Sequence, residues 1–457
     1  MYQNSGALDE GKRIAIVGGG FSGTLLAINL LRYSSAHVLL VERDPDKLGR
    51  GLAYGTDNPE HVLNVRASNM SAFPDAPDHF SRWLGEEDRE GANRFVPRRV
   101  YGRYLAEQLQ AARDVAPVRL TLVEGQVIAA QRQGKGWTLG LADGSKQECA
   151  LLVLAQGNMA PSRLPELDAL GPDIYCASPW IERPTKGLGK QDIILLIGTG
   201  LTAVDVALSL DVDGFEGRIV ALSRRGMRPR PHALVGPHVD RVDRPSASGS
   251  ALIRALRTRA SAIGWRAAVD ELRPFTQDLW RSMNLIERQR FLRHLRPYWD
   301  AHRHRLAPAV DRKVCAMQME ARLNFAAGKI VGATRIGDTA RIEWRIRGTD
   351  LKRAETVKRV INCTGPSGDI ASSSDLLLRN LMAEGHVRQD RLGLGLDVDR
   401  QGHVLDGEGR SHPDLLAVGP MTRAEGWEIV AVPDIRRQVW DVARRIGNAQ
   451  WVAGEGL

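Results

Sequence analysis

The stretch Arg13–Leu31 decides the fold, and it reads Arg-Ile-Ala-Ile-Val-Gly-Gly-Gly-Phe-Ser-Gly-Thr-Leu-Leu-Ala-Ile-Asn-Leu-Leu. Its first apolar run, Ile14–Val17, is typical of a buried parallel strand. Gly18, Gly20 and Gly23 follow as G-x-G-x-x-G, and the apolar spacing of a helix comes after them. In such a turn the first glycine permits a tight bend, the second lets a pyrophosphate approach the backbone, and the third lets helix pack on strand. The helix start adds amides and a positive dipole end, so the stretch predicts a phosphate-binding strand–turn–helix.

The next segment supplies the second half of the pattern. A further apolar strand, Val38–Val41, ends at Glu42, 19 residues after Gly23. An acid at this place accepts hydrogen bonds from a ribose diol, so the order of elements predicts a dinucleotide site. The alternative is a glycine-rich turn that serves packing only. The residues predicted to contact the cofactor here are Gly18, Gly20, Phe21, Ser22, Gly23, Glu42 and Arg43.

The same pattern recurs near the middle of the chain. The apolar strand Asp192–Ile197 leads into Gly198-Thr-Gly-Leu-Thr-Ala203, which is G-x-G-x-x-A, and the next strand is Arg218–Ser223. No acid follows that strand; Arg224 and Arg225 stand there instead. Arginine suits a 2′-phosphate, which favours NADPH over NADH, whereas the alternative is a pair of exposed loop arginines. The predicted contacts are Gly198, Gly200, Arg224 and Arg225.

Matching hairpins follow both starts, and each is closed by a return strand. The predicted strands are Gln126–Gln133, Trp137–Ala142 and Leu151–Ala155 in the first set, and Ile330–Ile336, Ala340–Arg347 and Arg359–Asn362 in the second. We therefore predict an α/β protein with two dinucleotide-binding, Rossmann-like domains, each with a β-meander insertion. The predicted FAD-binding domain has two parts, 1–182 and 357–457, and 183–356 is the NAD(P)H-binding domain. A helical, arginine-rich insert is expected at about 229–309.

That insert carries most of the excess charge of the chain. The 457 residues have a formal charge of +9, and 53 of the 63 basic residues are arginine. Residues 251–310 hold 12 arginines against five acids. The segment is either a lid that attracts an anionic substrate and coenzyme phosphates, or a solvated helical face with aromatics packed beneath it. No RNA-binding signature accompanies it, so no nucleic-acid partner is expected.

Metal, disulfide and membrane classes find no support in the sequence. The four cysteines lie far apart without a Cys-x-x-Cys pair, and His302 and His304, at i and i+2, do not share a helix face. No metal site is expected. No apolar run approaches the roughly 20 residues that span a bilayer, and no secretory signal is visible, so we expect a cytoplasmic protein without a membrane partner.

The C-terminal tail is expected to complete the first domain. Leu415–Gly419 reads as a strand, and a helix over about Asp434–Ile446 is predicted to lay its N-terminus against a flavin. Residues Glu425–Pro433, which include Trp427, would then lie near the isoalloxazine. Two facing dinucleotide sites in one chain indicate a hydride relay, with FAD in the first and NADPH or NADH in the second.

Several motifs resemble bacterial FAD/NAD(P)-binding proteins that are similar to flavin-containing N-hydroxylases. They are Gly49–Gly55, His61–Ala67, Phe73–Asp75, Trp83-Leu84, Val96–Arg98, Tyr101-Gly102, Ala221–Gly226, His302–Arg305, Asn362–Pro366 and Trp427-Glu428. The resemblance implies FAD on the first glycine turn and NAD(P)H on the second. It also implies that His61–Ala67 and Asn69 lie near the flavin ring. Pro420 follows Gly419 where the family usually has an aspartate for the ribityl chain, so that contact is left open within Gly419–Trp427.

The resemblance favours a monooxygenase acting through a flavin C4a-hydroperoxide on a small anionic or electron-rich substrate with O₂. Urate, hydroxylated at C5 to 5-hydroxyisourate, is the first substrate expected, because the family includes such an activity and the insert is basic. The alternatives are N-hydroxylation of an amino acid or amine, an NAD(P)H:quinone reductase, and a redox-sensing binder without catalysis. Candidate catalytic residues are Asn64, Asn69 and His232, and purely structural roles remain open for all three. The oligomeric state is not indicated.

Overall fold

The structure is a computed structural model that describes residues 12–85, 89–180, 186–234 and 243–448. The chain divides into two compact units. The first unit comprises Met1–Asp57, Val65–Met159 and Gly368–Leu457, and the second comprises Asn58–Asn64 and Ala160–Ser367.

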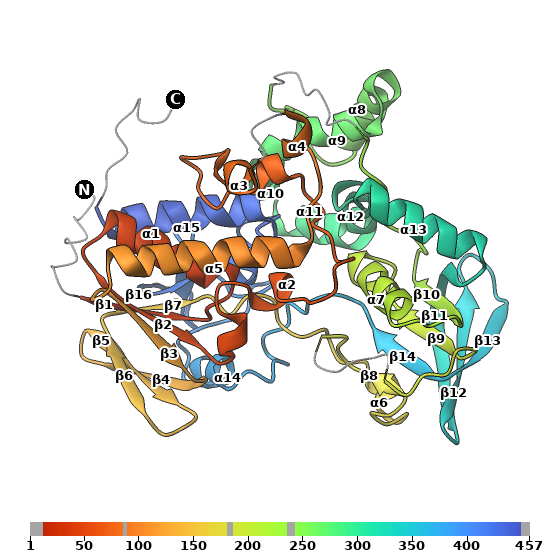
Figure 1. The fold of residues 1–457 in the computed structure, drawn as a ribbon, viewed down its shortest axis with the longest axis horizontal. Helices are drawn as coiled ribbons and strands as arrows, with labels where there is room; N and C mark the ends of the chain where they lie inside the picture. Colours follow the sequence, from red (N-terminus) through yellow and green to blue (C-terminus); the bar gives the residue numbers. More distant parts are fainter. Residues whose placement is uncertain (1–11, 86–88, 181–185, 235–242, 449–457) are drawn as a thin grey trace. The chain divides into compact units, whose positions relative to one another are not determined.

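A six-stranded sheet forms the centre of the first unit, in the order β15-β16-β7-β1-β2-β3. The strands are β1 (Arg13–Val17), β2 (His37–Glu42), β3 (Leu120–Glu124), β7 (Leu151–Leu154), β15 (His403–Leu405) and β16 (Ser411–Ala417). All neighbours are parallel except β15, which runs antiparallel to β16. The helices α1 (Phe21–Tyr33), α5 (Arg98–Val115) and α15 (Val432–Ile446) lie together on one face of the sheet (Figure 1). Short helices α2 (Gly51–Tyr54), α3 (His79–Trp83) and α4 (Arg89–Ala92) lie between β2 and α5 in the chain.

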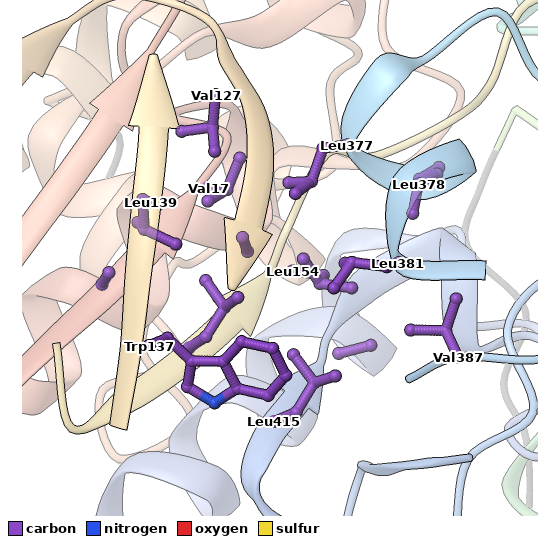
Figure 2. Packing of buried hydrophobic residues seen from close by; sticks show 14 of the residues in the cluster. Val17, Val127, Trp137, Leu139, Leu154, Leu377, Leu378, Leu381, Val387 and Leu415 are labelled. Atoms are coloured by element: carbon purple, nitrogen blue, oxygen red, sulfur yellow. The ribbon is translucent and has the colours of Figure 1, made fainter. Parts of the chain in front are cut away.

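The other face of this sheet is covered by the first meander. Its strands β4 (Val127–Gln133), β5 (Gly136–Leu141) and β6 (Lys146–Cys149) form a separate antiparallel sheet. Figure 2 shows the core between them, where Trp137 and Leu139 of β5 face Leu154 of β7 and Leu381 of α14 (Leu376–Ala383). Helices cover one face of the sheet and the meander covers the other. The strands are therefore buried on both faces, which is why their sequences are unbroken apolar runs.

The second unit is built on a seven-stranded sheet in the order β13-β12-β11-β10-β9-β14-β8. The strands are β8 (Tyr175–Cys176), β9 (Ile193–Ile197), β10 (Arg218–Ser223), β11 (Leu323–Ile336), β12 (Thr339–Ile346), β13 (Lys352–Val357) and β14 (Arg359–Asn362). Strand β11 pairs in parallel with β10 through its first five residues and antiparallel with β12 through the rest. The second meander is therefore continuous with its parallel sheet, unlike the first. Helices α6 (Pro165–Asp168) and α7 (Leu201–Val212) belong to this unit.

Helices dominate the segment between β10 and β11, as predicted for the insert. They are α8 (Gly249–Ile263), α9 (Trp265–Leu272), α10 (Thr276–Ser282), α11 (Leu285–Arg290), α12 (Arg296–Arg303) and α13 (Pro308–Met319). A π-helical turn, Phe291–Leu295, joins α11 to α12. Buried Trp280 and the ion pair between buried Arg305 and Asp270 (Nη1–Oδ2 2.9 Å) hold the helices together.

The predicted α/β class with two Rossmann-like halves is confirmed, and the two compact units divide the chain at other residues than the predicted domain boundaries do. Residues 160–182 and 357–367 belong to the second unit, because β8 pairs with β14 and β14 pairs with β9. Residues Asn58–Asn64 also cluster with the second unit instead of the first. These pairings join segments far apart in the sequence, so local composition gives no sign of them.

Two candidate dinucleotide sites

The first glycine turn is tightly enclosed by protein. Gly18 has a φ of +106°, and a Cβ added to it would lie 2.6 Å from the carbonyl oxygen of Ala155. A Cβ on Gly23 would lie 1.9 Å from the carbonyl oxygen of Gly18. Both positions therefore exclude any larger residue. Helix α1 begins directly after Gly20 with no side-chain cap and no acid in its first turn, which leaves a positive helix end for a phosphate.

Glu42 lies at the end of β2, as predicted, and it holds the glycine turn. Its carboxylate accepts hydrogen bonds from the backbone amides of Gly19 (2.7 Å) and Asp44 (3.1 Å). The acid is thus fixed beside the turn, where a ribose diol would meet it. Arg43, the next residue, is exposed.

The backbone of Gly49–Gly51 closes over this turn. In the sequence, only the family resemblance had indicated this segment. The amide of Gly49 donates to the carbonyl of Gly19 (2.8 Å), and the Cα of Gly51 lies 3.4 Å from the place of a Cβ on Gly20. Gly49 and Gly51 have φ values of +76° and +55°. A glycine is needed at both because the backbone is left-handed and the neighbouring backbone is close.

The side chains of Phe21 and Ser22 face protein. Phe21 packs against Tyr54 and Tyr101, with ring centroids 5.8 and 6.3 Å away. A Cβ on Gly419 would lie 2.3 Å from Ser22 Oγ, so the C-terminal segment reaches the start of α1. Any cofactor contact at Phe21 or Ser22 must therefore come from the backbone.

The C-terminal segment is fixed to α15. Gly419 N donates to Gln438 Oε1 (2.7 Å), and Gln438 Nε2 donates to Thr422 Oγ1 (2.9 Å). Trp427 is 8% exposed, and Glu428 adopts a φ of +73°, which is strained for a residue with a side chain. The predicted helix over Asp434–Ile446 is confirmed as α15, which starts two residues earlier.

Two buried polar atoms close to the first turn test whether a flavin dinucleotide fits. Gln156 follows β7, and its Cα lies 3.0 Å from the place of a Cβ on Gly18, while the ring centroid of Tyr101 lies 6.3 Å from that of Phe21. Among the described residues neither Gln156 Oε1 nor Tyr101 Oη has a hydrogen-bond partner. Buried polar atoms are rarely left unsatisfied, so these two, together with the Cβ-free cradle of Gly18, fit a polar group bound at the turn.

The second glycine turn is more open. A Cβ on Gly198 (φ +123°) would lie 2.4 Å from the carbonyl oxygen of Cys363, yet nothing lies within 4 Å of the place of a Cβ on Gly200. Ala203 takes the third position and is buried. Helix α7 also starts without a side-chain cap or a first-turn acid. This turn too presents a positive helix end for a phosphate.

The two arginines after β10 differ in their surroundings. Arg224 is exposed and makes no hydrogen bond or ion pair with the described residues. Arg225 Nη1 donates to Tyr298 Oη of α12 (3.1 Å). Their turn is fixed to the glycine turn, because Thr199 Oγ1 donates to the Met227 carbonyl (2.6 Å) and contacts Ser223 Oγ (2.9 Å). Arg224 is therefore presented to solvent at the place where a 2′-phosphate is expected.

Of the three candidate catalytic residues, two contact each other. His232 Nε2 donates to the backbone carbonyl of Asn64 (3.0 Å), and both residues belong to the second unit. Asn69 ends a 3-10 turn in the first unit and is exposed.

The segment Asn58–Asn64 is anchored on α7. His61 Nε2 lies 3.0 Å from both the Asp205 carbonyl and Ser209 Oγ, and Asn58 Nδ2 donates to Ser209 Oγ (3.2 Å). Lys313 of α13 forms an ion pair with Glu60 (2.7 Å). No sequence pattern indicates that this segment belongs to the second unit, because its partners on α7 lie about 150 residues away.

Comparison with known proteins bears on the first turn. Residues 15–159 match the model of the FAD-NAD(P)-binding family. This segment contains the first glycine turn, Glu42 and the first meander. The resemblance predicted from the motifs is thus confirmed for this part of the chain. No curated protein sequence matches the chain.

Solved structures share the fold over nearly the whole chain. An ornithine hydroxylase from Pseudomonas aeruginosa is 18% identical with a TM-score of 0.64, covering 96% of this chain and 99% of its own. A cadaverine monooxygenase from Erwinia amylovora, solved with FAD, is 12% identical with a TM-score of 0.66 and 97% coverage of both chains. An ornithine N-hydroxylase from Kutzneria sp. 744, solved with reduced FAD, NADP⁺ and L-ornithine, is 16% identical with a TM-score of 0.61, covering 96% and 99%. At these identities the likeness shows the fold alone, a dinucleotide-binding α/β fold that these three proteins share.

The described ranges also bear on metal ligands, disulfides and membrane-spanning helices. No cluster of three or more His, Cys, Asp or Glu side chains there is arranged to hold a metal ion. All four cysteines are free thiols. None of the described helices has the length and hydropathy of a bilayer-spanning segment.

Proposed function

We propose that this chain is an NADPH-dependent flavin monooxygenase that hydroxylates the nitrogen of a small amine or amino acid. The observation that carries the proposal is the pair of glycine turns in one chain, with an acid fixed beside the first and an exposed arginine beside the second. An acid suits a ribose diol and an arginine suits a 2′-phosphate, so the two turns select different dinucleotides.

The first turn would hold the ADP half of FAD. Amides at the start of α1 would bind the pyrophosphate, and the Glu42 carboxylate would accept hydrogen bonds from the adenosine ribose. Gln156 Oε1 would gain the hydrogen-bond partner that it lacks. Bound FAD supplies the redox chemistry: it accepts a hydride and, once reduced, passes one atom of O₂ to the substrate.

The second turn would hold NADPH. The start of α7 would bind the pyrophosphate, and Arg224 would meet the 2′-phosphate as a charge-assisted partner. His232 and Asn64 belong to the same unit and their mutual hydrogen bond fixes the imidazole. We assign them a positioning role near the coenzyme, and Asn69 remains a candidate for contact with the flavin.

Oxygen suits the flavin as electron acceptor better than a protein dithiol does. All four cysteines are free, and burial raises the pKa of Cys149 to about 12 and also raises the pKa of Cys363. Buried thiols held in the neutral form are poor nucleophiles toward a flavin or a disulfide. The balanced reaction converts an amine, NADPH, H⁺ and O₂ into a hydroxylamine, NADP⁺ and water.

The substrate class follows from the nature of the structural relatives. The three described above are hydroxylases or monooxygenases of ornithine or cadaverine, and a fourth, from Pseudomonas syringae, is an L-lysine 6-monooxygenase (17% identity, TM-score 0.64). Nothing among these relatives supports urate. Urate therefore enters as the competing substrate that an experiment must test.

The test measures NADPH oxidation, O₂ uptake and product mass for the FAD-loaded protein with L-ornithine, L-lysine, cadaverine and urate in turn. We expect one amine to stimulate O₂ uptake and to gain one oxygen atom. If urate alone gave a hydroxylated product, the substrate class would be a purine and not an amine. NADPH oxidation that ignores every substrate and yields only hydrogen peroxide would contradict a monooxygenase, and rapid quinone reduction would then favour a reductase.

A further inference from the structure

A cluster of cationic side chains surrounds one tyrosine hydroxyl in the second unit. Tyr298 of α12 is 42% exposed, and Arg225 both donates to its hydroxyl (3.1 Å) and lies over its ring, 4.9 Å from the centroid. Arg225 Nη2 also donates to the carbonyl of Arg293 (3.4 Å), within the π-helical turn before α12. Hydrogen bonds from Arg347 and then Arg225 lower the pKa of the Tyr298 hydroxyl. Two guanidinium groups therefore meet at a single exposed oxygen.

This cluster lies at the end of β10, where the adenosine ribose of a bound coenzyme is expected. The backbone amide of Arg347 donates to the carbonyl of Ala327 (3.0 Å), and Ala327 is the partner of Ser223 in the sheet. Ser223 Oγ in turn accepts from the amide of Gly226 (2.9 Å), which fixes the turn that carries Arg224 and Arg225. Three segments therefore converge on one place: the turn after β10, the end of β12 and the insert.

Resting on the NADPH-dependent function proposed above, we propose that Tyr298 and Arg347 complete the 2′-phosphate site, with Tyr298 as a positioning residue that holds Arg225 and Arg347 ready for the phosphate. Two like charges at one neutral oxygen repel each other, and a dianion between them removes that repulsion. Arg224 is exposed beside the cluster and adds a third cation. Because the arginines are already held in place, little side-chain entropy is lost when the phosphate binds.

The proposal gives the insert a role in coenzyme choice. Tyr298 belongs to residues 251–310, whose net charge is +7, and its hydroxyl supplies the geometry of the site. An NADH molecule would carry no group to place between Arg225 and Arg347. The preference for NADPH over NADH would therefore depend on the 2′-phosphate, which neutralises the cluster, and on the Tyr298 hydroxyl, which keeps Arg225 and Arg347 together.

The test measures the Kd of the FAD-loaded protein for 2′,5′-ADP and for 5′-AMP, which differ by the 2′-phosphate. We expect Arg347→Gln to weaken 2′,5′-ADP binding by about tenfold or more, and Tyr298→Phe by about threefold to tenfold. Both variants should leave 5′-AMP binding within about twofold of the wild type, and KM for NADPH should rise while kcat is unchanged. Arg345→Gln, which removes an exposed arginine two residues earlier on the same strand, should change neither affinity.

The outcomes separate this inference from the proposed function. Equal weakening of both probes by Tyr298→Phe and Arg347→Gln, or no weakening, would overturn the inference and leave the NADPH site standing. A wild-type protein that binds both probes equally would overturn the inference and point to NADH as the reductant. A wild-type protein that binds neither probe would overturn the proposed function as well.

Discussion

The two glycine turns share one strand–turn–helix plan but differ in how much room they leave. In the first, Gly23 presses against Gly18 and the backbone at Gly51 closes over Gly20. In the second, Ala203 is accommodated and Gly200 has open space around it. An enclosed turn suits a dinucleotide that stays bound through many turnovers, whereas an open turn suits one that must enter and leave in every turnover.

The residues that follow each second strand sharpen the contrast. Glu42 is fixed by two backbone amides, whereas Arg224 is held by nothing among the described residues. One turn thus presents an acid for a ribose and the other presents cations for a phosphate. On the proposed function, the same fold would serve two ligands through a difference of a few side chains.

The largest effect is expected from exchanging the third residue of each turn. Gly23→Ala should destabilise the first unit by about 3 kcal/mol and abolish most flavin binding, because the new Cβ would overlap the Gly18 carbonyl oxygen. Ala203→Gly should cost about 1 kcal/mol or less, since only a methyl group is removed from a first helical turn. Thermal unfolding and flavin absorbance per protein measure both. A yellow, stable Gly23→Ala protein would refute the enclosed character of the first turn.

The next largest effect concerns the acid of the first turn. Glu42→Gln should weaken FAD binding by about 10–100-fold, because a charge-assisted hydrogen bond becomes a neutral one, and it should leave NADPH affinity unchanged. Glu124→Gln is the matched control, since Glu124 is the exposed sheet neighbour of Glu42. Flavin release on dilution gives the FAD Kd. If the two variants released FAD alike, Glu42 would have no special part in the site.

A smaller effect is expected from the arginine of the second turn. Arg224→Gln should raise the KM for NADPH by about tenfold and leave that for NADH within about twofold, because only NADPH carries the 2′-phosphate. Arg345→Gln, which removes another exposed arginine of the same unit, should change neither value. Steady-state kinetics with both coenzymes check this. Equal losses for NADPH and NADH would eliminate the 2′-phosphate role.

The smallest effect concerns a buried histidine beside the first meander. His412 of β16 lies beside the first meander, where burial lowers its pKa, and Trp137, Asp414, Arg132 and His386 surround it. As the pH falls through 6.5, the unfolded chain takes up a proton before the folded unit does, so stability should fall. Thermal unfolding from about pH 7.5 to about pH 5.5 measures this. His412→Asn should flatten the dependence, and an unchanged slope would assign it to other groups.

Much of the fold could be predicted from the sequence because its signals are local. Both glycine turns, the strand pairs of both meanders, the return strand β14 and helix α15 depend on apolar spacing and turn residues within about 20 positions. The acid and the arginines after the second strands are read in the same way. These local patterns were enough to locate both glycine turns and the residues after the second strands, whose contacts with a cofactor stay predictions.

The rest depends on contacts between distant segments. Asn58–Asn64 joins the second unit through α7, and Gly49 closes on the first turn. Tyr298 of the insert contacts Arg225, and Arg347 at the end of β12 contacts Tyr298. None of these residues stands in a period or spacing that signals its partner. The pairing of β8 with β14, which brings both strands into the second unit, also joins segments that no sequence pattern connects.

The central claim is that one enclosed turn holds FAD and one open turn supplies NADPH to it. Anaerobic mixing of the purified yellow protein with NADPH or NADH tests this most directly, with flavin absorbance as the readout. We predict that NADPH bleaches the flavin faster than NADH at equal concentration, and that Arg224→Gln removes the difference. A flavin that neither coenzyme reduces, or a purified protein that binds no flavin at all, would contradict the account.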